Sequence, residues 1–296
     1  MGDYGRALEF GVSVEPLADP PDHVAKIAVA ADRARLDLVG IQDHPYQRRF
    51  LDTWTLISTL VPITENVRFF PDVANLPLRP PAMLAKAAAS LDVLSGGRVE
   101  VGLGAGAFWD AVVGMGGPRR TPGEARRATE EAVEVMRMVW SGERSLRFDG
   151  EFYALRGMRP GPPPAHDIGI WIGAYGPRML GLIGRKADGW VPSLGYAGPG
   201  RLPAMHEKID EGASEADRDP SEIKRILNVS GNIGPDGDGL LEGPVEKWVE
   251  TLTALVLEGG MDTFVYWPGA DHRRQTEAFA SEVTPAVREA VEGARS

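Results

Sequence analysis

Residues 67–104 have the sequence VRFFPDVANLPLRPPAMLAKAAASLDVLSGGRVEVGLG. The apolar runs Val67–Val73 and Val99–Gly104 predict two strands. Between them, Pro80-Pro81 opens an apolar helix that extends to about Leu94. Ser95-Gly96-Gly97 ends this helix, because glycine is favoured just past a helix C-terminus. A strand, a helix and a second strand in so short a segment predict a parallel βαβ unit.

The same alternation continues on both sides of this unit. Further strands are predicted at Phe10–Val14, Leu38–His44, Ile168–Gly173, Gly189–Ser193, Ile226–Ile233 and Thr263–Trp267. Helices are predicted from Asp19-Pro20 (Asp19 as N-cap, Pro20 as first helical residue), at Thr53–Val61, from the Thr121–Glu124 capping box to Val139, and at Pro177–Arg185, Pro203–Ala213, Val245–Val256 and Thr276–Val291. Eight such repeats predict an α/β fold, a (β/α)₈ TIM barrel rather than an open sheet, in a single domain over residues 1–296.

One stretch departs from this alternation. Residues Ser141–Asp167 contain no long helical pattern, and Pro160–Pro164 is a loop. We expect an excursion here, between the fourth and fifth units, with a possible hairpin in Leu146–Leu155.

Composition narrows the function classes. The chain has no cysteine and a formal net charge of −10, which excludes disulfides and thiolate chemistry and argues against a nucleic-acid partner. Met1–Glu9 does not have the pattern of a signal peptide, and no uncharged apolar run approaches the roughly 18 residues of a membrane helix. No His/Asp/Glu spacing typical of a metal site is present. These features predict a cytoplasmic enzyme without a membrane or metal site, which acts on a small molecule.

The run Gly102–Ala107 fits the dinucleotide pattern G-x-G-x-x-(G/A) after a predicted strand. That pattern also requires a helix at its last glycine and an acidic residue at the end of a second strand about 20 residues on. Neither is found, since the next predicted helix begins near Gly123. The sequence therefore disfavours a Rossmann fold.

Barrel enzymes carry their chemistry at the C-terminal ends of the strands. The second strand ends in Asp43-His44, where an imidazole can move protons near neutral pH and the carboxylate can bind a cofactor; alternatively, the pair caps a loop. The third strand ends with Asp72, Val73 and Asn75, which either face the site or form an exposed rim. Gly104-Ala105-Gly106 ends the fourth strand, and its small residues either admit a flat ring or pack tightly.

The fifth unit, Gly173-Ala174-Tyr175-Gly176-Pro177-Arg178, passes from a strand through a small-residue turn into a helix. Free backbone N–H groups and the helix dipole favour an anion there, and Arg178 adds a planar donor. The alternative is an ordinary βα turn. Structural or solvent roles are expected for the remaining histidines, His23, His166, His206 and His272, although His272 could line the barrel mouth.

The motifs at 73–82, 91–98, 101–106, 173–178 and 187–190 together resemble the bacterial luciferase-like superfamily, most closely its coenzyme F420-dependent branch. The resemblance runs from about Phe10 to Phe264. It implies a deazaflavin across the barrel mouth, His44 as acid/base, Asp43 as a cofactor contact and a non-proline cis peptide at Asp72–Val73. It further implies that Gly104 and Gly106 lie along the cofactor, that Gly173–Arg178 bind its phosphate, and that the protein is a homodimer.

The chain departs from this branch at Ala107. Its sugar-phosphate dehydrogenases have Glu at that position, so a sugar-phosphate substrate is not expected, and Phe108 and Trp109 favour a more apolar one. The leading hypothesis is hydride transfer between coenzyme F420 and an organic substrate. The alternatives are an FMN-dependent monooxygenase using reduced flavin and oxygen, and a non-catalytic flavin-binding relative.

Overall fold

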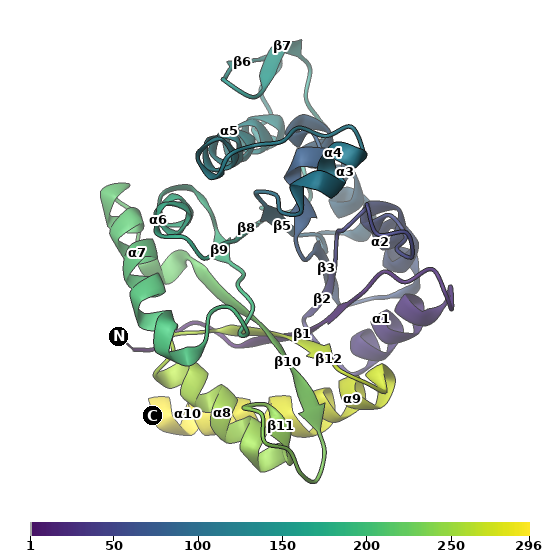
Figure 1. Cartoon of the computed structure of the whole chain (residues 1–296), viewed down its shortest axis with the longest axis vertical. Coiled ribbons are helices and arrows are strands. Elements are labelled where there is room, and N and C mark those ends of the chain that lie inside the picture. The colour runs from purple at the N-terminus through teal and green to yellow at the C-terminus, as the bar shows by residue number, and fades with distance from the viewer. Residues whose placement is uncertain (1) are drawn as a thin grey trace.

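A computed structural model of the chain describes residues 2–296 and contains a nearly closed barrel of parallel strands ringed by helices (Figure 1). The strands are hydrogen-bonded in the order β3-β2-β1-β12-β10-β9-β8-β5-β4. Their bounds are β1 Glu9–Val14, β2 Leu38–Ile41, β3 Arg68–Pro71, β4 Ala74–Asn75, β5 Val101–Gly104, β8 Ile170–Gly173, β9 Gly189–Trp190, β10 Lys224–Ile233 and β12 Thr263–Pro268, with the short β11, Glu242–Gly243, paired to β10. The predicted TIM barrel is confirmed.

The barrel closes at the segment Val67–Val73, which the sequence predicted as one strand. This strand is divided into β3 and β4 by Asp72-Val73, whose peptide bond is cis as the resemblance implied. A parallel bridge between Phe69 of β3 and Val99, just before β5, joins the two ends of the strand path. The polar bulge at 72–73 therefore lies at the seam of the barrel.

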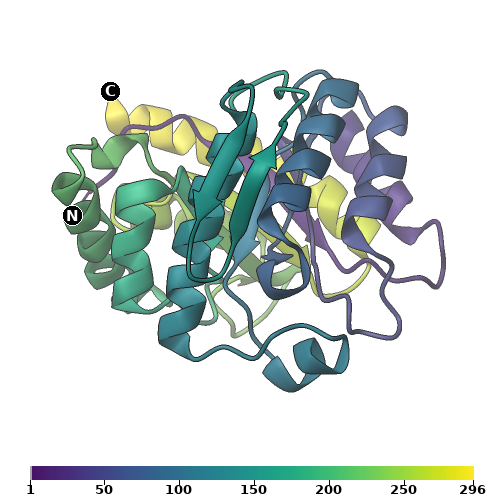
Figure 2. The ribbon, with the colours of Figure 1, turned by 90° about the horizontal axis from the view of Figure 1, so that it is seen from above.

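Ten α-helices are found among residues 2–296, mostly on the outside of the barrel (Figures 1 and 2). They are α1 His23–Arg33, α2 Thr53–Leu60, α3 Pro81–Ser95, α4 Trp109–Gly114, α5 Pro122–Trp140, α6 Pro177–Lys186, α7 Leu202–Glu215, α8 Val245–Leu257, α9 His272–Ala278 and α10 Thr284–Arg295. Within the described residues, no helix has both the length and the hydropathy needed to cross a membrane.

Two helix predictions were wrong in detail. The first helix begins at His23 with Asp22 as its N-cap, not at Asp19-Pro20, because a residue that precedes proline, here Pro20 before Pro21, is disfavoured in the helical region. The last predicted helix consists of α9, the π-helical turn Phe279–Val283 and α10. No helix was predicted between Gly106 and Gly123, but the short helix α4 forms there.

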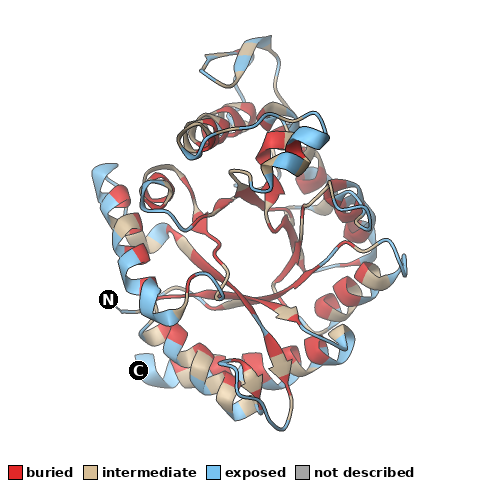
Figure 3. Ribbon diagram, viewed as in Figure 1, coloured by how far each residue is buried: buried red, intermediate tan, exposed pale blue. Residues whose placement is uncertain are grey.

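Buried residues lie on the barrel strands and along the surrounding helices (Figure 3), and their apolar side chains form two clusters. The inner cluster consists of Leu38, Phe70, Trp171, Val191, Ile226 and Val265, which the strands direct inward. Because these large residues fill the barrel, it has a packed core rather than a pore, and space for chemistry is left at its ends.

An antiparallel hairpin, β6 Leu146–Asp149 and β7 Ala154–Met158, follows α5 and lies outside the helix ring (Figures 1 and 2). Its turn is held by Glu131 of α5, whose carboxylate accepts hydrogen bonds from the backbone N–H groups of residues 151–153 at 2.7–3.1 Å. Arg127 of α5 adds an ion pair to Glu151 at 2.7 Å, so α5 tethers the hairpin turn to the barrel through several side chains.

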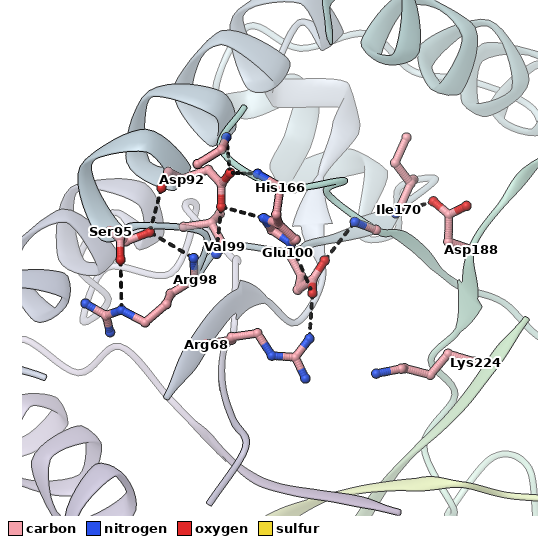
Figure 4. Close-up of polar contacts among 12 residues, drawn as sticks. Arg68, Asp92, Ser95, Arg98, Val99, Glu100, His166, Ile170, Asp188 and Lys224 are labelled. Atoms are coloured by element: carbon pink, nitrogen blue, oxygen red, sulfur yellow. Dashed lines mark hydrogen bonds and ion pairs between the residues drawn. The ribbon is translucent and has the colours of Figure 1, made fainter. Parts of the chain in front are cut away.

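Charged residues link the N-terminal ends of the strands, at the opposite end from the mouth (Figure 4). Glu9 pairs with Lys224 at 2.6 Å and with Arg68 at 2.7 Å, and Arg68 also pairs with Glu100 at 2.6 Å. His166 Nδ1 lies 2.8 Å from an Asp92 oxygen. We call these residues the floor network. In a TIM barrel, residues at the N-terminal ends of the strands usually contribute to the stability of the fold.

Candidate active site

The strand register brings the four predicted segments to one end of the barrel. Asn75 pairs with Gly104, and Gly104 pairs with Gly173, so three of the segments lie side by side. The fourth joins them because the Asn75 backbone N–H donates to Asp43 Oδ2 at 2.9 Å. This shared opening, the mouth, is where a cofactor would contact all four.

His44 follows β2 by three residues and is half-buried at the mouth. Its Nδ1 lies 2.5 Å from the Tyr46 hydroxyl, which leaves Nε2 as the nitrogen available for proton transfer. The ring meets Phe108 edge-on, with 5.7 Å between centroids. Burial lowers the pKa of His44, against the opposing effect of the Asp43 and Glu15 charges. The imidazole is therefore neutral at neutral pH and suited to accept a proton.

Asp43 is buried and its carboxylate is already occupied. Arg79 donates to both of its oxygens, from Nε at 2.6 Å and from an Nη at 2.7 Å. The same guanidinium bonds Asp52, the N-cap of α2, at 2.6 Å. Burial opposes the charge of Arg79, but its bonds to Asp43 and Asp52 outweigh this effect and raise the pKa of Arg79. These contacts support the alternative in which Asp43 caps a loop. Direct contact between Asp43 and a cofactor stays a prediction.

Asp72 is buried rather than on an exposed rim, so that alternative was wrong. Its carboxylate accepts hydrogen bonds from Ser13 Oγ and from Asn228 Nδ2, both at 3.0 Å. Burial raises its pKa to about 6, with the hydrogen bonds acting in the opposite direction. A carboxyl group of this kind changes charge close to neutral pH.

Asn75 carries an unpaired acceptor at the mouth. Its side chain is buried, yet Oδ1 has no hydrogen-bond partner within residues 2–296. Buried polar groups are nearly always paired. This oxygen therefore fits a site that a ligand N–H or O–H group completes.

The glycines around β5 are required by packing. A Cβ on Gly102 would lie 2.2 Å from the Pro71 carbonyl oxygen, and one on Gly104 would lie 2.8 Å from a Val73 methyl group. Gly106 has φ of +110°, and a Cβ there would lie 2.6 Å from the Pro77 ring. Tight packing is thus the reason for glycine at these positions, and contact of Gly104, Ala105 and Gly106 with a cofactor stays a prediction.

The turn between β8 and α6 has an open geometry. Gly176 is the extended N-cap of α6, Pro177 is its first residue, and a Cβ on Gly176 would meet nothing within 4 Å. Tyr175 and Arg178 are exposed beside it. The first N–H groups of a helix lack partners in the helix, so this terminus can accept an anion. Gly173 and Ala174 are more buried and lead into the turn.

Tyr46, Ser13 and Asn228 are neighbours of these residues that no sequence pattern had singled out. Tyr46 and Phe108 form an aromatic wall with His44, and Phe108 has φ of +52°. Ser13 and Asn228 hold Asp72 and stand as polar residues within apolar strands, which is the signal that would have identified them.

The four remaining histidines lie in three settings. His23 and His272 form a ring pair with centroids 5.1 Å apart, at the starts of α1 and α9. His166 belongs to the floor network, and His206 is buried against Trp190. Within residues 2–296, no group of three His, Asp or Glu side chains is arranged to hold a metal ion.

Comparison with known proteins places the chain in a family. The family model for luciferase-like monooxygenases matches residues 4–242. The chain is 31% identical to the 5,10-methylenetetrahydromethanopterin reductase of Methanolobus tindarius over 266 residues, 89% of this chain and 76% of the relative. It is 26% identical to the F420-dependent glucose-6-phosphate dehydrogenase of Rhodococcus erythropolis over 95% of this chain and 98% of the relative.

Solved structures agree on the fold. A structure of an F420-dependent secondary alcohol dehydrogenase in complex with an F420-acetone adduct superposes with a TM-score of 0.87, at 21% identity over 96% of this chain and 100% of that one. The tetrahydromethanopterin reductase of Methanopyrus kandleri, described as coenzyme F420-dependent, gives a TM-score of 0.84 at 20% identity, covering 95% and 99%. With its barrel, its cis Asp72–Val73 peptide and the family match over most of its length, the chain belongs to the luciferase-like monooxygenase family.

Proposed function

We propose that this chain is a coenzyme F420-dependent oxidoreductase that transfers a hydride between the deazaflavin and an organic substrate of apolar character. The observation that carries the proposal is a half-buried His44, bonded to Tyr46 through Nδ1, at the same mouth as the unpaired Asn75 Oδ1. Two relatives that match the chain over 98% of their own length are named F420-dependent, which supports the choice of cofactor.

The residues of the mouth fit this group. Asn75 Oδ1 would accept a ring N–H, and the start of α6 at Gly176–Arg178 would take the phosphate. Asp72 and Val73 would lie under the ring. When bound, coenzyme F420 supplies the hydride donor or acceptor.

His44 handles the proton of the reaction. In the oxidative direction a substrate alcohol loses its hydroxyl proton to His44 Nε2 as its carbon gives up the hydride, and a carbonyl forms. In the reductive direction Nε2 returns the proton to the carbonyl oxygen. The hydrogen bond of Nδ1 to Tyr46 holds the ring in place for both directions.

The walls of the mouth support an apolar substrate. Ala107 provides no carboxylate at the position where the sugar-phosphate branch has one, and the neighbouring Phe108 is 66% exposed beside His44. Val113 and Met115, on and just after α4, are also exposed. Small apolar alcohols, aldehydes or ketones match such a surface better than a sugar phosphate does.

Three further assignments belong to the same proposal. We infer a single-domain cytoplasmic enzyme that assembles as a homodimer. The exposed apolar side chains of Ile63, Met83, Val93 and Leu94, on and before α3, support self-association.

Anaerobic turnover with coenzyme F420 tests the proposal. A panel of apolar secondary alcohols and of sugar phosphates would be followed through the visible absorbance of the deazaflavin. We expect turnover with an apolar member, and a loss of about 10²- to 10⁴-fold in His44→Ala with cofactor affinity retained. Oxygen consumption with reduced FMN and no turnover with F420 would instead favour the monooxygenase. Tight cofactor binding without turnover in either assay would favour a non-catalytic protein.

A further inference from the structure

His44 and Tyr46 lie on one tight turn at the mouth. The backbone N–H of Gln47 donates to the carbonyl oxygen of His44 at 2.9 Å, which closes a four-residue turn. Pro45 is its second residue, where the fixed φ of proline suits such a turn. The turn brings the Tyr46 ring against the imidazole, with 5.4 Å between the ring centroids. The local sequence therefore holds the two side chains together without a ligand.

Tyr46 forms its hydrogen bond with the nitrogen of His44 that the reaction leaves free. The hydroxyl oxygen lies 2.5 Å from Nδ1, and Nε2 remains for the substrate. Within residues 2–296, this nitrogen is the one hydrogen-bond partner of the hydroxyl. The Tyr46 side chain is only partly buried and the adjacent Gln47 is exposed, so water can reach the other hydrogen-bonding position of the hydroxyl. A hydroxyl both donates and accepts, as a group that passes protons onward must.

Both groups are neutral at neutral pH before the reaction. Burial lowers the pKa of His44, and the charges of Asp43 and Glu15 oppose this effect. Burial, and then the charge of Asp43, raise the pKa of Tyr46, so its phenol keeps its proton. A neutral imidazole that takes a proton at Nε2 becomes cationic unless a second proton leaves from Nδ1. The Tyr46 hydroxyl is the group to which that second proton can move.

We propose that Tyr46 is a positioning residue that acts through His44 and completes a proton relay from the substrate to water. As the substrate hydroxyl gives its proton to Nε2, Nδ1 passes its own proton to the Tyr46 oxygen, and that oxygen releases its former proton to water. One proton enters the pair and one leaves, so both side chains stay neutral. In the reductive direction each proton moves the opposite way. The proposal rests on the proposed function, because that function makes Nε2 the site of proton transfer.

Titration of the protein without cofactor gives a test that does not depend on turnover. The pKa of His44 would be measured by NMR of its imidazole in the wild type, in Tyr46→Phe and in the control Tyr196→Phe. Tyr46→Phe keeps the aromatic ring and removes only the hydroxyl. Tyr196 lies on the loop after β9 and is 68% exposed, so the control removes the same chemical group at a different place.

We expect Tyr46→Phe to lower the pKa of His44 by about one unit, because the imidazolium loses a charge-assisted hydrogen bond to the hydroxyl oxygen. The charges of Asp43 and Glu15 stay in place in both variants, so the shift reports the hydroxyl. Tyr196→Phe should leave the pKa of His44 unchanged. An unchanged pKa in Tyr46→Phe, or equal shifts in the two variants, would overturn the relay and leave the proposed function intact.

Turnover with coenzyme F420 tests the transfer of the proton itself. In Tyr46→Phe, kcat should fall about ten-fold with little change in KM, a smaller loss than in His44→Ala. A small base in the buffer, such as free imidazole at constant pH, should restore part of kcat in this variant as its concentration rises, because it can take the proton from Nδ1 in place of the hydroxyl. The same base should not change kcat of the wild type or of Tyr196→Phe.

Two kinetic results would overturn the relay while the wild type still turns over and the proposed function stands. One is a wild-type kcat in Tyr46→Phe. The other is a lowered kcat that no concentration of the base restores, because Tyr46 would then act on the imidazole only by packing. If the wild type showed no turnover with coenzyme F420, the proposed function would be overturned, and the relay with it.

Discussion

Arg79 donates two hydrogen bonds to the carboxylate of Asp43, at 2.6 and 2.7 Å, and a third to Asp52 at the start of α2. Asp43 also accepts the backbone N–H of Asn75. One guanidinium thus ties together the end of β2, the bulge strand β4 and α2. Because His44 follows Asp43 directly, this ion pair sets the position of the imidazole, and Arg79 is a positioning residue.

Replacing Arg79 should therefore impair both stability and chemistry. Arg79→Leu leaves Asp43 buried without its partner, which costs about 3 kcal/mol of unfolding free energy. Arg79→Lys keeps the charge but not the planar pair of donors, so it should recover only part of the loss. Urea unfolding measures the loss of stability in each variant, and separate values of kcat and KM measure the loss of chemistry. An unchanged kcat in a folded Arg79→Leu protein would contradict a positioning role.

The buried carboxyl group of Asp72 should make stability depend on pH. Its pKa is raised to about 6 from 3.8, so its contribution to stability is complete below about pH 4 and is lost as the pH rises through 6. Asp72→Asn removes this titration and keeps similar hydrogen-bonding groups.

The Asp72→Asn variant should exceed the wild type in unfolding free energy at pH 8, by up to about 3 kcal/mol, and approach it at pH 4. Urea unfolding at the two pH values measures the difference. If the unfolding free energies of the two proteins changed with pH in parallel, ionisation of Asp72 would carry no cost in stability, which would contradict the prediction.

Two glycines of the mouth should respond in opposite ways to alanine. At Gly102 a Cβ would lie 2.2 Å from a backbone oxygen, so Gly102→Ala must displace the bulge and should cost about 1–3 kcal/mol or more. At Gly176 a Cβ meets open space, so Gly176→Ala should unfold at nearly the wild-type temperature. Thermal unfolding of the pair decides the matter, and equal melting temperatures would mean that the seam is not packed as described.

The floor network should also contribute to the stability of the fold in a way that depends on pH. The nearby carboxylates of Glu100 and Asp92 raise the pKa of His166 despite its partial burial. The contribution is therefore complete below the ordinary pKa of about 6.5 and is lost as the pH rises through the higher folded value. His166→Gln should lower the melting temperature more at pH 6 than at pH 9. An equal decrease at both pH values would assign His166 a packing role alone.

The fold could be predicted because strand and helix patterns alternate with clear punctuation, as at Ser95-Gly96-Gly97, where α3 ends at Ser95 and Gly96 adopts a left-handed conformation. Local patterns failed at the starts of two helices. The start of α1 depends on the restriction that Pro21 places on Pro20, and α4 forms within a glycine-rich segment after Phe108.

The sequence predicted which strand ends form the candidate site. It did not predict the contacts between side chains that lie far apart in the sequence. Arg79 lies 36 residues from Asp43, and Asn228 lies 156 residues from Asp72. No spacing rule relates such pairs, because the barrel alone brings them together. The position of each strand end in the sequence therefore predicted where chemistry occurs but not which side chains are already paired.

We propose that a deazaflavin binds where four strand ends meet. Hydrogen exchange of backbone amides, with and without coenzyme F420, tests it most directly. We predict slower exchange in peptides covering 73–75, 104–106 and 174–180, and no change in the floor peptides around Glu9 and Lys224. Protection at the floor, or none at the mouth with saturating cofactor, would contradict the claim.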